Sequence, residues 1–197
     1  MIIGITGGTG CGKTTALDAI RQLGGQVIDC DAVYHSLLQT DTAMLSAIDS
    51  RFPGTVQNGQ LDRKKLGGLV FSDPVALQDL NAITHQAVKA EVIRLLKAKP
   101  MLAAIDAISL FESGLSDLCD MTVAVTAPED VRIRRLMARD GIDAAYAAQR
   151  IAAQKPQSYF RERCDYVLEN FGTRREFQDK CLAFFKNPDI IKTEIQA

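Results

Sequence analysis

The sequence predicts an α/β fold in which a parallel β-sheet is covered by helices on both faces. Short apolar runs alternate with longer amphipathic stretches along the 197 residues, which is the pattern of strands and helices in alternation. The apolar runs show little polar alternation, as expected of strands that are buried on both faces. A glycine-rich stretch, GGTGCGKT at residues 7–14, joins the first apolar run to the first amphipathic one.

We expect five strands, each of four to six apolar residues, at Ile2–Thr6, Gln26–Asp29, Leu102–Asp106, Met121–Thr126 and Asp165–Leu168. A helix over Thr14–Leu23 follows the glycine stretch. Residues 32–100 form a long insertion between the second and third strands, and its pattern predicts helix throughout. The clearest helix of the insertion runs over Pro74–Lys99, where apolar residues recur at helical spacing. Asn58-Gly59 is a turn signal that interrupts the pattern.

Composition and charge exclude several classes of protein. The chain carries 23 basic and 24 acidic residues and a net charge of -1, so it offers no field of one sign for a nucleic acid or a membrane surface. Its five cysteines form no CxxC pair, which argues against a disulfide framework and a zinc site. No export signal or long apolar run is present. We therefore expect a cytoplasmic protein without nucleic-acid or membrane partners, and a monomer by default.

The stretch GGTGCGKT fits the pattern GxxxxGK[ST] and lies between a predicted strand and a predicted helix, the context that a phosphate-binding loop requires. Gly8, Gly10 and Gly12 allow the backbone to point N–H groups inward, and the helix N-terminus adds its partial positive charge. Lys13 is then expected to reach the β- and γ-phosphates of a nucleotide, and the hydroxyl of Thr14 to ligate Mg²⁺.

Two further residues of this loop have alternative interpretations. Thr15 either packs or caps the helix, or contacts the α-phosphate. Cys11 is either a small residue that the loop tolerates, or a redox-sensitive thiol whose pKa is lowered near the helix N-terminus.

Three classes of protein use such a loop: nucleotide switches, motor ATPases and small-molecule kinases. A switch needs a DxxG after the third strand and an NKxD-like guanine reader, whereas the chain has IDAI at residues 105–108 and no NKxD. A motor normally carries a DE pair at the end of the third strand, but Ala107 follows Asp106. The sequence therefore favours a small-molecule kinase.

An acceptor-side carboxylate is expected where the second strand ends in Asp29-Cys30-Asp31, because the carboxyl ends of neighbouring parallel strands open onto one crevice. On an extended chain the side chains of Asp29 and Asp31 face the same way. We assign Asp31 as the base or orienter of the attacking hydroxyl, and Asp29 as a metal or structural partner. The alternative is that the pair caps a helix beginning near Ala32. Asp106 competes with Asp29 for the metal.

Cationic groups come from the stretch VRIRRLMARDG, in which Arg132, Arg135 and Arg139 lie on one helical side. As a group they suit the charge that phosphoryl transfer spreads over three oxygens, although a surface helix often carries such residues for solvation alone. Gly141 then allows the following segment, residues 140–156, to hinge as a lid.

Several stretches together resemble one family, the dephospho-coenzyme A kinases. They are IIGITGGTGCGKTT, VIDCDAVYH, LDRKKLGGLVF, LNAITH, LFESGL, RRLMARD with RIAAQ, and DYVLENFG, and they cover essentially the whole chain. The glycine loop alone is generic, but the ordered set is specific.

The resemblance implies a P-loop NTPase fold over residues 1–197, with a five-stranded parallel sheet, an inserted helical substrate domain at residues 32–100 and a lid. It implies ATP-dependent phosphorylation of the ribose 3′-hydroxyl of dephospho-CoA, with Mg²⁺. The implied nucleotide-binding residues are Gly8, Gly10, Cys11, Gly12, Lys13, Thr14, Thr15, Asn170 and Gly172, the last two bordering the adenine. The implied acceptor-side residues are Asp31, Asp62, Arg63 and His85, with Thr14, Asp29 and Asp106 near the metal and Lys13, Asp31 and Arg139 in catalysis.

Some of these transfers have structural alternatives. Asp62 also fits a helix cap, and His85 also fits a hydrogen-bonded histidine inside a helix. The chain departs from the family pattern at Gly67, where arginine is expected, and at Gln86, where proline is common. It departs again at Ser109, just before Leu110, where the motif tends to be Pro-Leu-Leu-Phe-Glu, and at Arg132, a position that is often glutamine. The first three concern acceptor contacts and leave the phosphate loop intact.

Two other functions stay open from the sequence. One is a kinase of a different small hydroxyl or monophosphate acceptor, because the insertion sets the acceptor. The other is a nucleotide-binding module that senses ATP or CoA-like ligands without catalysis.

Overall fold

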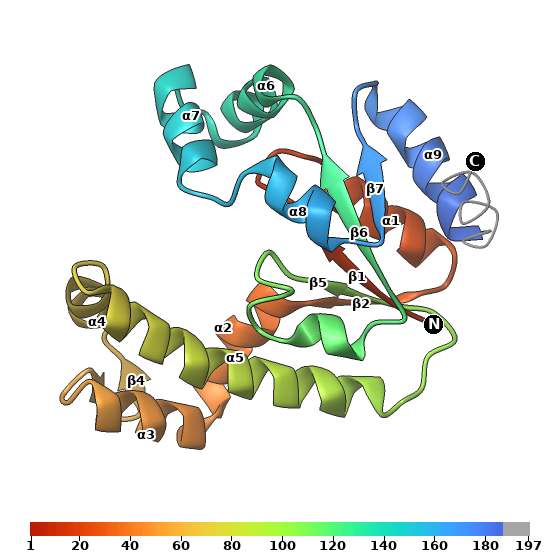
Figure 1. Cartoon of the computed structure of the whole chain (residues 1–197). Helices are drawn as coiled ribbons and strands as arrows, with labels where there is room; N and C mark the ends of the chain where they lie inside the picture. The colour runs from red at the N-terminus through yellow and green to blue at the C-terminus, as the bar shows by residue number, and fades with distance from the viewer. Residues whose placement is uncertain (187–197) are drawn as a thin grey trace. The chain divides into compact units, whose positions relative to one another are not determined.

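The computed structural model describes residues 1–186 and divides the chain into two compact units. Of the described residues, the first unit comprises 1–27, 100–110 and 118–186. The second unit comprises Ile28–Lys99 and Phe111–Asp117. Figure 1 follows the chain through these elements by colour.

The first unit is built on a five-stranded sheet with the strand order β2-β5-β1-β6-β7. The strands are β1 (Ile2–Thr6), β2 (Gln26–Asp29), β5 (Ala103–Asp106), β6 (Met121–Thr126) and β7 (Tyr166–Glu169). The helices are α1 (Lys13–Gln22), α6 (Glu129–Asp140), α7 (Ala144–Ala152), α8 (Gln157–Arg163) and α9 (Arg174–Lys186). The last two residues of β2 begin the second unit.

Strand β1 lies at the centre of the sheet and pairs in parallel with β5 and β6, while β6 pairs in parallel with β7. In this register Ile5 lies between Asp106 and Val123. The glycine loop therefore leaves the sheet from its central strand, beside the carboxyl ends of its neighbours. The predicted parallel α/β fold is confirmed.

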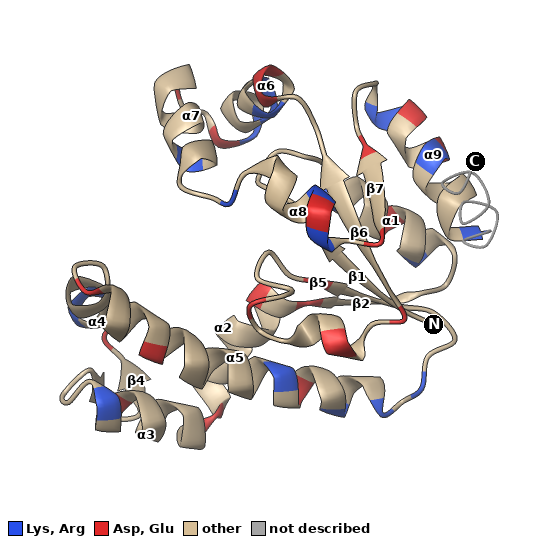
Figure 2. Cartoon of the chain, in the orientation of Figure 1, with Lys and Arg blue, Asp and Glu red and all other residues tan. Residues whose placement is uncertain are grey.

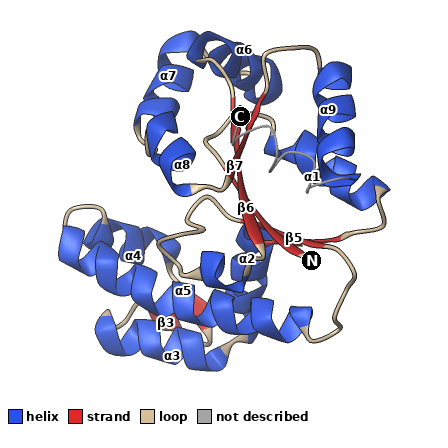
Figure 3. Cartoon of the chain, turned by 45° about the vertical axis from the view of Figure 1, so that its right-hand side comes forward, coloured by secondary structure: helices blue, strands red, loops and turns tan. Residues whose placement is uncertain are grey.

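The core of the first unit forms where helices cover the sheet. Helices α1 and α9 lie to one side of β6 and β7, and α8 lies to the other (Figure 3). Buried residues of the strands, of α1 and of α9 form one cluster, in which Ile3, Ile5 and Val123 have no exposed surface. Because these strands are covered on both faces, their sequences do not alternate between apolar and polar residues.

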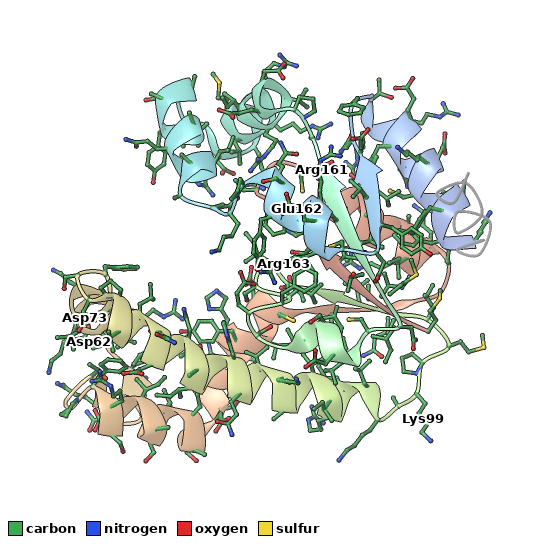
Figure 4. All side chains as sticks on the ribbon, in the orientation of Figure 1. Asp62, Asp73, Lys99, Arg161, Glu162 and Arg163 are labelled. Carbon is green, nitrogen blue, oxygen red and sulfur yellow. The ribbon has the colours of Figure 1, made fainter. Side chains whose placement is uncertain are left out.

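The second unit is mainly helical. Its elements are α2 (Cys30–Thr40), α3 (Thr42–Arg51), β3 (Val56–Gln57), β4 (Gln60–Leu61), α4 (Arg63–Val70) and α5 (Pro74–Leu96), followed by a short 3-10 turn, η1 (Leu115–Leu118), which ends in the first unit. Aspartates begin α3, α4 and α5: the carboxylates of Asp41, Asp62 and Asp73 accept hydrogen bonds from first-turn N–H groups. Figure 4 labels Asp62 and Asp73 at the starts of their helices. Such caps satisfy N–H groups that have no partner within the helix.

The prediction that the insertion is helical throughout is wrong at one place. Strands β3 and β4 form a two-stranded antiparallel hairpin, with Val56 opposite Leu61. The turn consists of Asn58 and Gly59, whose φ angles are 52° and 75°. Asn-Gly is the residue pair that a two-residue hairpin turn with left-handed backbone prefers. The turn signal was visible in the sequence, but two-residue strands carry no periodicity that predicts them.

Several element boundaries differ from the sequence prediction; helix α1, for example, covers Lys13–Gln22 rather than Thr14–Leu23. Strand β5 begins at Ala103 rather than at Leu102. Strand β7 begins one residue late, because the side chain and the N–H of Asp165 bond to Thr122 before the ladder starts. Helix α5 ends at Leu96 rather than at Lys99, which has a left-handed φ of 49°. Within residues 1–186, no helix is long and apolar enough to cross a bilayer.

Candidate functional site

The loop of residues 7–14 has the backbone of an anion cradle. Gly7, Gly10 and Gly12 have φ angles of 140°, 76° and 104°, which other residues rarely adopt. Space also demands glycine, because a Cβ at Gly7 would lie 2.2 Å from the carbonyl oxygen of Val125. A Cβ at Gly12 would lie 2.2 Å from Nδ2 of Asn170. The tight packing around the loop thus enforces the glycine pattern.

Helix α1 begins at Lys13 without a side-chain cap and without an acidic residue in its first turn. Its first N–H groups and its partial positive charge are therefore available to an anion. The ammonium of Lys13 folds back and donates to the carbonyl of Gly7 at 3.1 Å. Thr14, the expected metal ligand, is exposed at the start of the helix.

Helix α6 holds the loop from outside with two arginines. Nε of Arg132 donates to the carbonyl oxygen of Thr9 at 2.8 Å, and Nη1 of Arg135 lies 3.3 Å from the carbonyl oxygens of Gly10 and Cys11. Arg132 is only 3% exposed, and burial lowers its pKa from the usual value. Figure 2 shows basic and acidic residues together on α6. Arg132 therefore supports the loop backbone.

The loop, α6 and the segment after β7 line a cavity of about 610 Å³. Its lining residues are Gly8, Thr9, Gly10, Gly12, Lys13, Thr14, Thr15, Arg135, Leu136, Arg139, Asn170, Gly172 and Arg174. Most of the expected nucleotide-binding residues thus share one cavity in the first unit. Cys11 does not line it: the thiol is buried, and burial raises its pKa. The geometry thus does not favour the interpretation of Cys11 as a redox-sensitive thiol of lowered pKa.

Arg139 lies at this cavity and pairs with Asp140, its neighbour, at 2.7 Å. Arg150 of α7 binds the same carboxylate. Hydrogen bonds from Arg139 and Arg150 hold the pKa of Asp140 at about 2. Helix α6 ends at Asp140 and is followed by Gly141, whose φ is 65°. The ion pairs of Asp140 with Arg139 and Arg150 connect the end of α6 to α7, at the start of the segment expected to form a lid.

The expectation for Asp29 and Asp31 needs correction. Helix α2 begins at Cys30, and Oδ1 of Asp29 accepts a hydrogen bond from the N–H of Ala32 at 3.0 Å. The two aspartates are therefore not spaced along an extended chain, and the argument that they face the same way is wrong. The capping alternative holds for Asp29. Asp31 lies in the first turn of α2 and is exposed.

The remaining acceptor-side residues also lie in the second unit. Asp62 caps α4 through the N–H of Lys65 at 2.9 Å. Arg63 is exposed and lines two cavities of that unit, of about 550 and 500 Å³. His85 is half-buried in α5. Burial lowers the pKa of His85, and a hydrogen bond to the backbone of Glu112 opposes this effect only in part.

Of the positions that depart from the family pattern, Gly67 and Gln86 lie in the second unit, whereas Ser109 and Arg132 lie in the first. Gly67 lies in α4, where a Cβ would stand 3.1 Å from the ring of Phe71. Gln86 is exposed on α5, and Ser109 follows β5 in the first unit. A cavity lined by Arg63, Gly67 and Phe71 remains where a longer side chain is expected.

A magnesium ion fits the donor chemistry of the first unit. Asp106 is the last residue of β5 and lies opposite Ile5 of β1, the strand that leads into the loop. The Oδ1 atom of Asp106 is buried. Carboxylate and hydroxyl oxygens such as those of Asp106 and Thr14 are ligands that Mg²⁺ prefers. Within residues 1–186 no three His, Cys, Asp or Glu side chains form a metal cage. Two protein oxygen donors, from Asp106 and Thr14, suit an Mg²⁺ ion whose other ligands are phosphate oxygens and water.

Sequence reasoning missed two residues of this site. Oε1 of Gln154 accepts a hydrogen bond from the N–H of Thr9 at 2.7 Å, and Arg174 lines the cavity from the first turn of α9. A basic residue shortly after the last strand is a signal that was available for Arg174. No local pattern indicates Gln154, because its partner lies 145 residues away.

Comparison with known proteins identifies the family. The family model described as "Dephospho-CoA kinase" matches residues 1–176 of the chain. The chain belongs to the dephospho-CoA kinase family. It is 42% identical over 177 residues to the dephospho-CoA kinase of Anaeromyxobacter dehalogenans, covering 87% of this chain and 84% of that protein. It is 37% identical over 198 residues to the enzyme of that name from Geobacillus kaustophilus, covering 98% of each.

Solved structures agree with this assignment. The crystal structure of TT1252 from Thermus thermophilus is similar with a TM-score of 0.80 and 35% identity, covering 96% of this chain and 97% of that one. The shikimate kinase of Bacteroides thetaiotaomicron is similar in fold alone, with a TM-score of 0.53, 16% identity, and coverage of 95% and 96%. Membership of a dephospho-CoA kinase family makes the chain a phosphotransferase that uses ATP; the reaction of the family is the final step of coenzyme A biosynthesis.

Proposed function

We propose that the chain transfers the γ-phosphoryl group of ATP to the ribose 3′-hydroxyl of dephospho-CoA, giving coenzyme A. The cavity of the first unit carries this proposal: a glycine loop, Lys13 and three arginines line one space of about 610 Å³. Cationic groups and inward N–H groups suit a triphosphate. The substrate follows from membership of the family and from the names of the relatives.

Each group has a distinct role in the proposed reaction. Lys13 and Arg139 bind the phosphates whose charge spreads over three oxygens during transfer, and their positive charge stabilises that state. Asp31 orients the attacking hydroxyl or accepts its proton. Asn170 and Gly172 lie on the side of the cavity that follows β7, where we place the nucleoside.

Thr14 and Asp106 are the groups we propose for Mg²⁺, which would neutralise phosphate charge when bound. We prefer Asp106 to Asp29, because the carboxylate of Asp29 already caps α2. Exchange of Asp29 for Asn keeps a capping side chain and removes the charge. Retained turnover in Asp29→Asn, with loss of the magnesium response in Asp106→Asn, is the expected result.

On the acceptor side we propose Asp62, Arg63 and His85. Asp62 acts by fixing the start of α4 and hence the position of Arg63, whose guanidinium suits the diphosphate of dephospho-CoA. His85 lies on α5 of the same unit. The second unit, which contains the insertion of residues 32–100, is thus the substrate domain in this proposal, and residues 140–156 are the lid.

We further propose that the protein acts in the cytoplasm as a monomer without a nucleic-acid partner. Its five cysteines all lie in the described residues 1–186 and form no disulfide there, which suits a reducing compartment, and its net charge is -1.

The decisive experiment is ADP release by the purified protein with Mg-ATP and one acceptor at a time. Dephospho-CoA is compared with shikimate, pantetheine, cytidine monophosphate and adenosine monophosphate. Turnover with dephospho-CoA alone, and a product heavier by one phosphate, supports the proposal. Turnover with another acceptor assigns a different kinase reaction, and ATP binding without turnover assigns a sensor.

A further inference from the structure

The carbonyl oxygens of the phosphate loop receive hydrogen bonds from side chains outside the loop. The carbonyl of Thr9 accepts from Arg132, and that of Cys11 accepts from both Arg135 and Asn170. The bond from Nδ2 of Asn170 to the oxygen of Cys11 is 2.9 Å long and is buried.

Peptide planarity converts these contacts into control of the cradle. The C=O of Cys11 and the N–H of Gly12 belong to one trans peptide, so they point in opposite directions. When Asn170 holds the carbonyl of Cys11 in one direction, the direction of the N–H of Gly12 is fixed as well. Asn170 thereby sets the direction of the N–H group of Gly12.

Asn170 is held rigidly enough to do this. Its side chain is 3% exposed, and its own N–H extends the sheet by donating to the carbonyl of Thr126 at 2.8 Å. Three residues later Thr173 and Glu176 form a reciprocal cap at the start of α9. The segment around Asn170 is therefore fixed at both ends.

The amide also reaches the cationic helix. Oδ1 of Asn170 accepts a hydrogen bond from Nη2 of Arg135 at 3.0 Å, while Nη1 of the same guanidinium lies against the loop. Both polar atoms of the Asn170 side chain are thus engaged, one with the loop and one with Arg135. A side chain so engaged is poorly placed to read a nucleotide base.

We infer that Asn170 is a positioning residue for the phosphates: it orients the Cys11–Gly12 peptide and the guanidinium of Arg135, and it does not recognise the adenine. The inference rests on the proposed nucleotide site and reassigns one member of it. It predicts that Asn170 contributes to the binding of any ligand with a diphosphate, with or without a base.

Calorimetric titration with inorganic pyrophosphate and with ADP tests this inference without the acceptor. We expect Asn170→Ala to weaken both ligands by the same factor, about 10-fold or more, since a buried loop carbonyl and Arg135 each lose a partner. Weaker binding of ADP with unchanged binding of pyrophosphate would show that Asn170 recognises the base. Unchanged binding of both ligands would show that Asn170 does not position the phosphates. Asn81→Ala, an exposed asparagine of α5, is the matched control.

A double-mutant cycle gives a second, independent test. Arg135→Ala and Asn170→Ala should be coupled, so the double variant binds ADP at most about 3-fold more weakly than the weaker single variant. If the loss of ADP affinity in the double variant equals the product of the two single losses, the link between Asn170 and Arg135 is wrong. Thermal unfolding of each variant confirms that it folds. Failure of turnover with dephospho-CoA would leave these binding results unaffected, so the two proposals fail separately.

Discussion

The N–H of Thr9 and Oε1 of Gln154 are joined by a hydrogen bond of 2.7 Å. Thr9 belongs to the phosphate loop, and Gln154 follows helix α7 in the segment we propose as the lid. The same Oε1 lies 3.5 Å from Nη2 of Arg132. One amide thus ties the end of the lid segment to the backbone of the loop.

Removal of this tie should weaken the folded state. Gln154→Ala leaves the N–H of Thr9 without its acceptor, so we expect the free energy of unfolding to fall by about 1 kcal/mol. Gln154→Glu keeps an acceptor and lies beside Arg132, so it should stay near the parent value. Urea unfolding measures both. Gln149→Ala, an exposed glutamine of α7, is the control; an equal loss in that variant would contradict the assignment.

Loss of the catalytic charges should abolish turnover without unfolding the chain. We expect Lys13→Ala to lower kcat by at least about 100-fold, because the phosphates lose a positive charge during transfer. Lys97→Ala, which replaces an exposed lysine after α5, should retain full activity.

Asp31→Asn should lower kcat by about 100-fold or more if the carboxylate of Asp31 serves the attacking hydroxyl. The matched control is Asp41→Asn, which keeps a helix cap. Near-normal turnover in Asp31→Asn would end the assignment of the base.

Stability should fall in mild acid through His85. Burial lowers the pKa of His85 below its value of 6.5 in the unfolded chain, so the unfolded state binds the proton more readily. The contribution of His85 is then complete above about pH 6.5 and is lost as the pH falls through the lower pKa of the folded state. We expect the free energy of unfolding to drop less in His85→Gln than in the parent between pH 7 and 5. His35→Gln, which replaces an exposed histidine of α2, is the control variant.

Backbone strain should be relieved by glycine at Lys99. The residue has a left-handed φ of 49°, a conformation that costs an ordinary side chain about 1–2 kcal/mol. Figure 4 labels Lys99 just beyond the end of α5. We expect Lys99→Gly to raise the midpoint of thermal unfolding, whereas Lys97→Gly should lower it, because Lys97 has a helical φ of -59°. A fall in both variants would show that Lys99 bears no strain.

Local patterns in the sequence predicted most of the fold. The five strands follow from apolar runs that are buried on both faces, and the glycine loop follows from a pattern that only one backbone geometry satisfies. The hairpin of β3 and β4 was missed because its strands are two residues long. The capping role of Asp29 stood only as an alternative, because the sequence does not show that α2 begins at the next residue.

Contacts between distant parts of the chain were beyond sequence reasoning. Asn170 bonds to Cys11 across 159 residues, and Arg132 bonds to Thr9 across 123. The spacing of the arginines showed that they share a helical side, but it did not show that Arg132 would be buried against the loop. Such partners depend on how the sheet brings the ends of β1, β6 and β7 together.

The second unit is assembled from two separate stretches of chain, and this has a consequence for synthesis on the ribosome. His85 meets the backbone of Glu112, and Lys89 pairs with Asp117 at 3.2 Å; both partners lie in residues 111–117, beyond strand β5. Residues 28–99 therefore emerge without the segment that completes their unit. That unit reaches its final contacts only after β5, a strand of the other unit, has also been made, so a fragment that ends at residue 99 would lack part of its own structure.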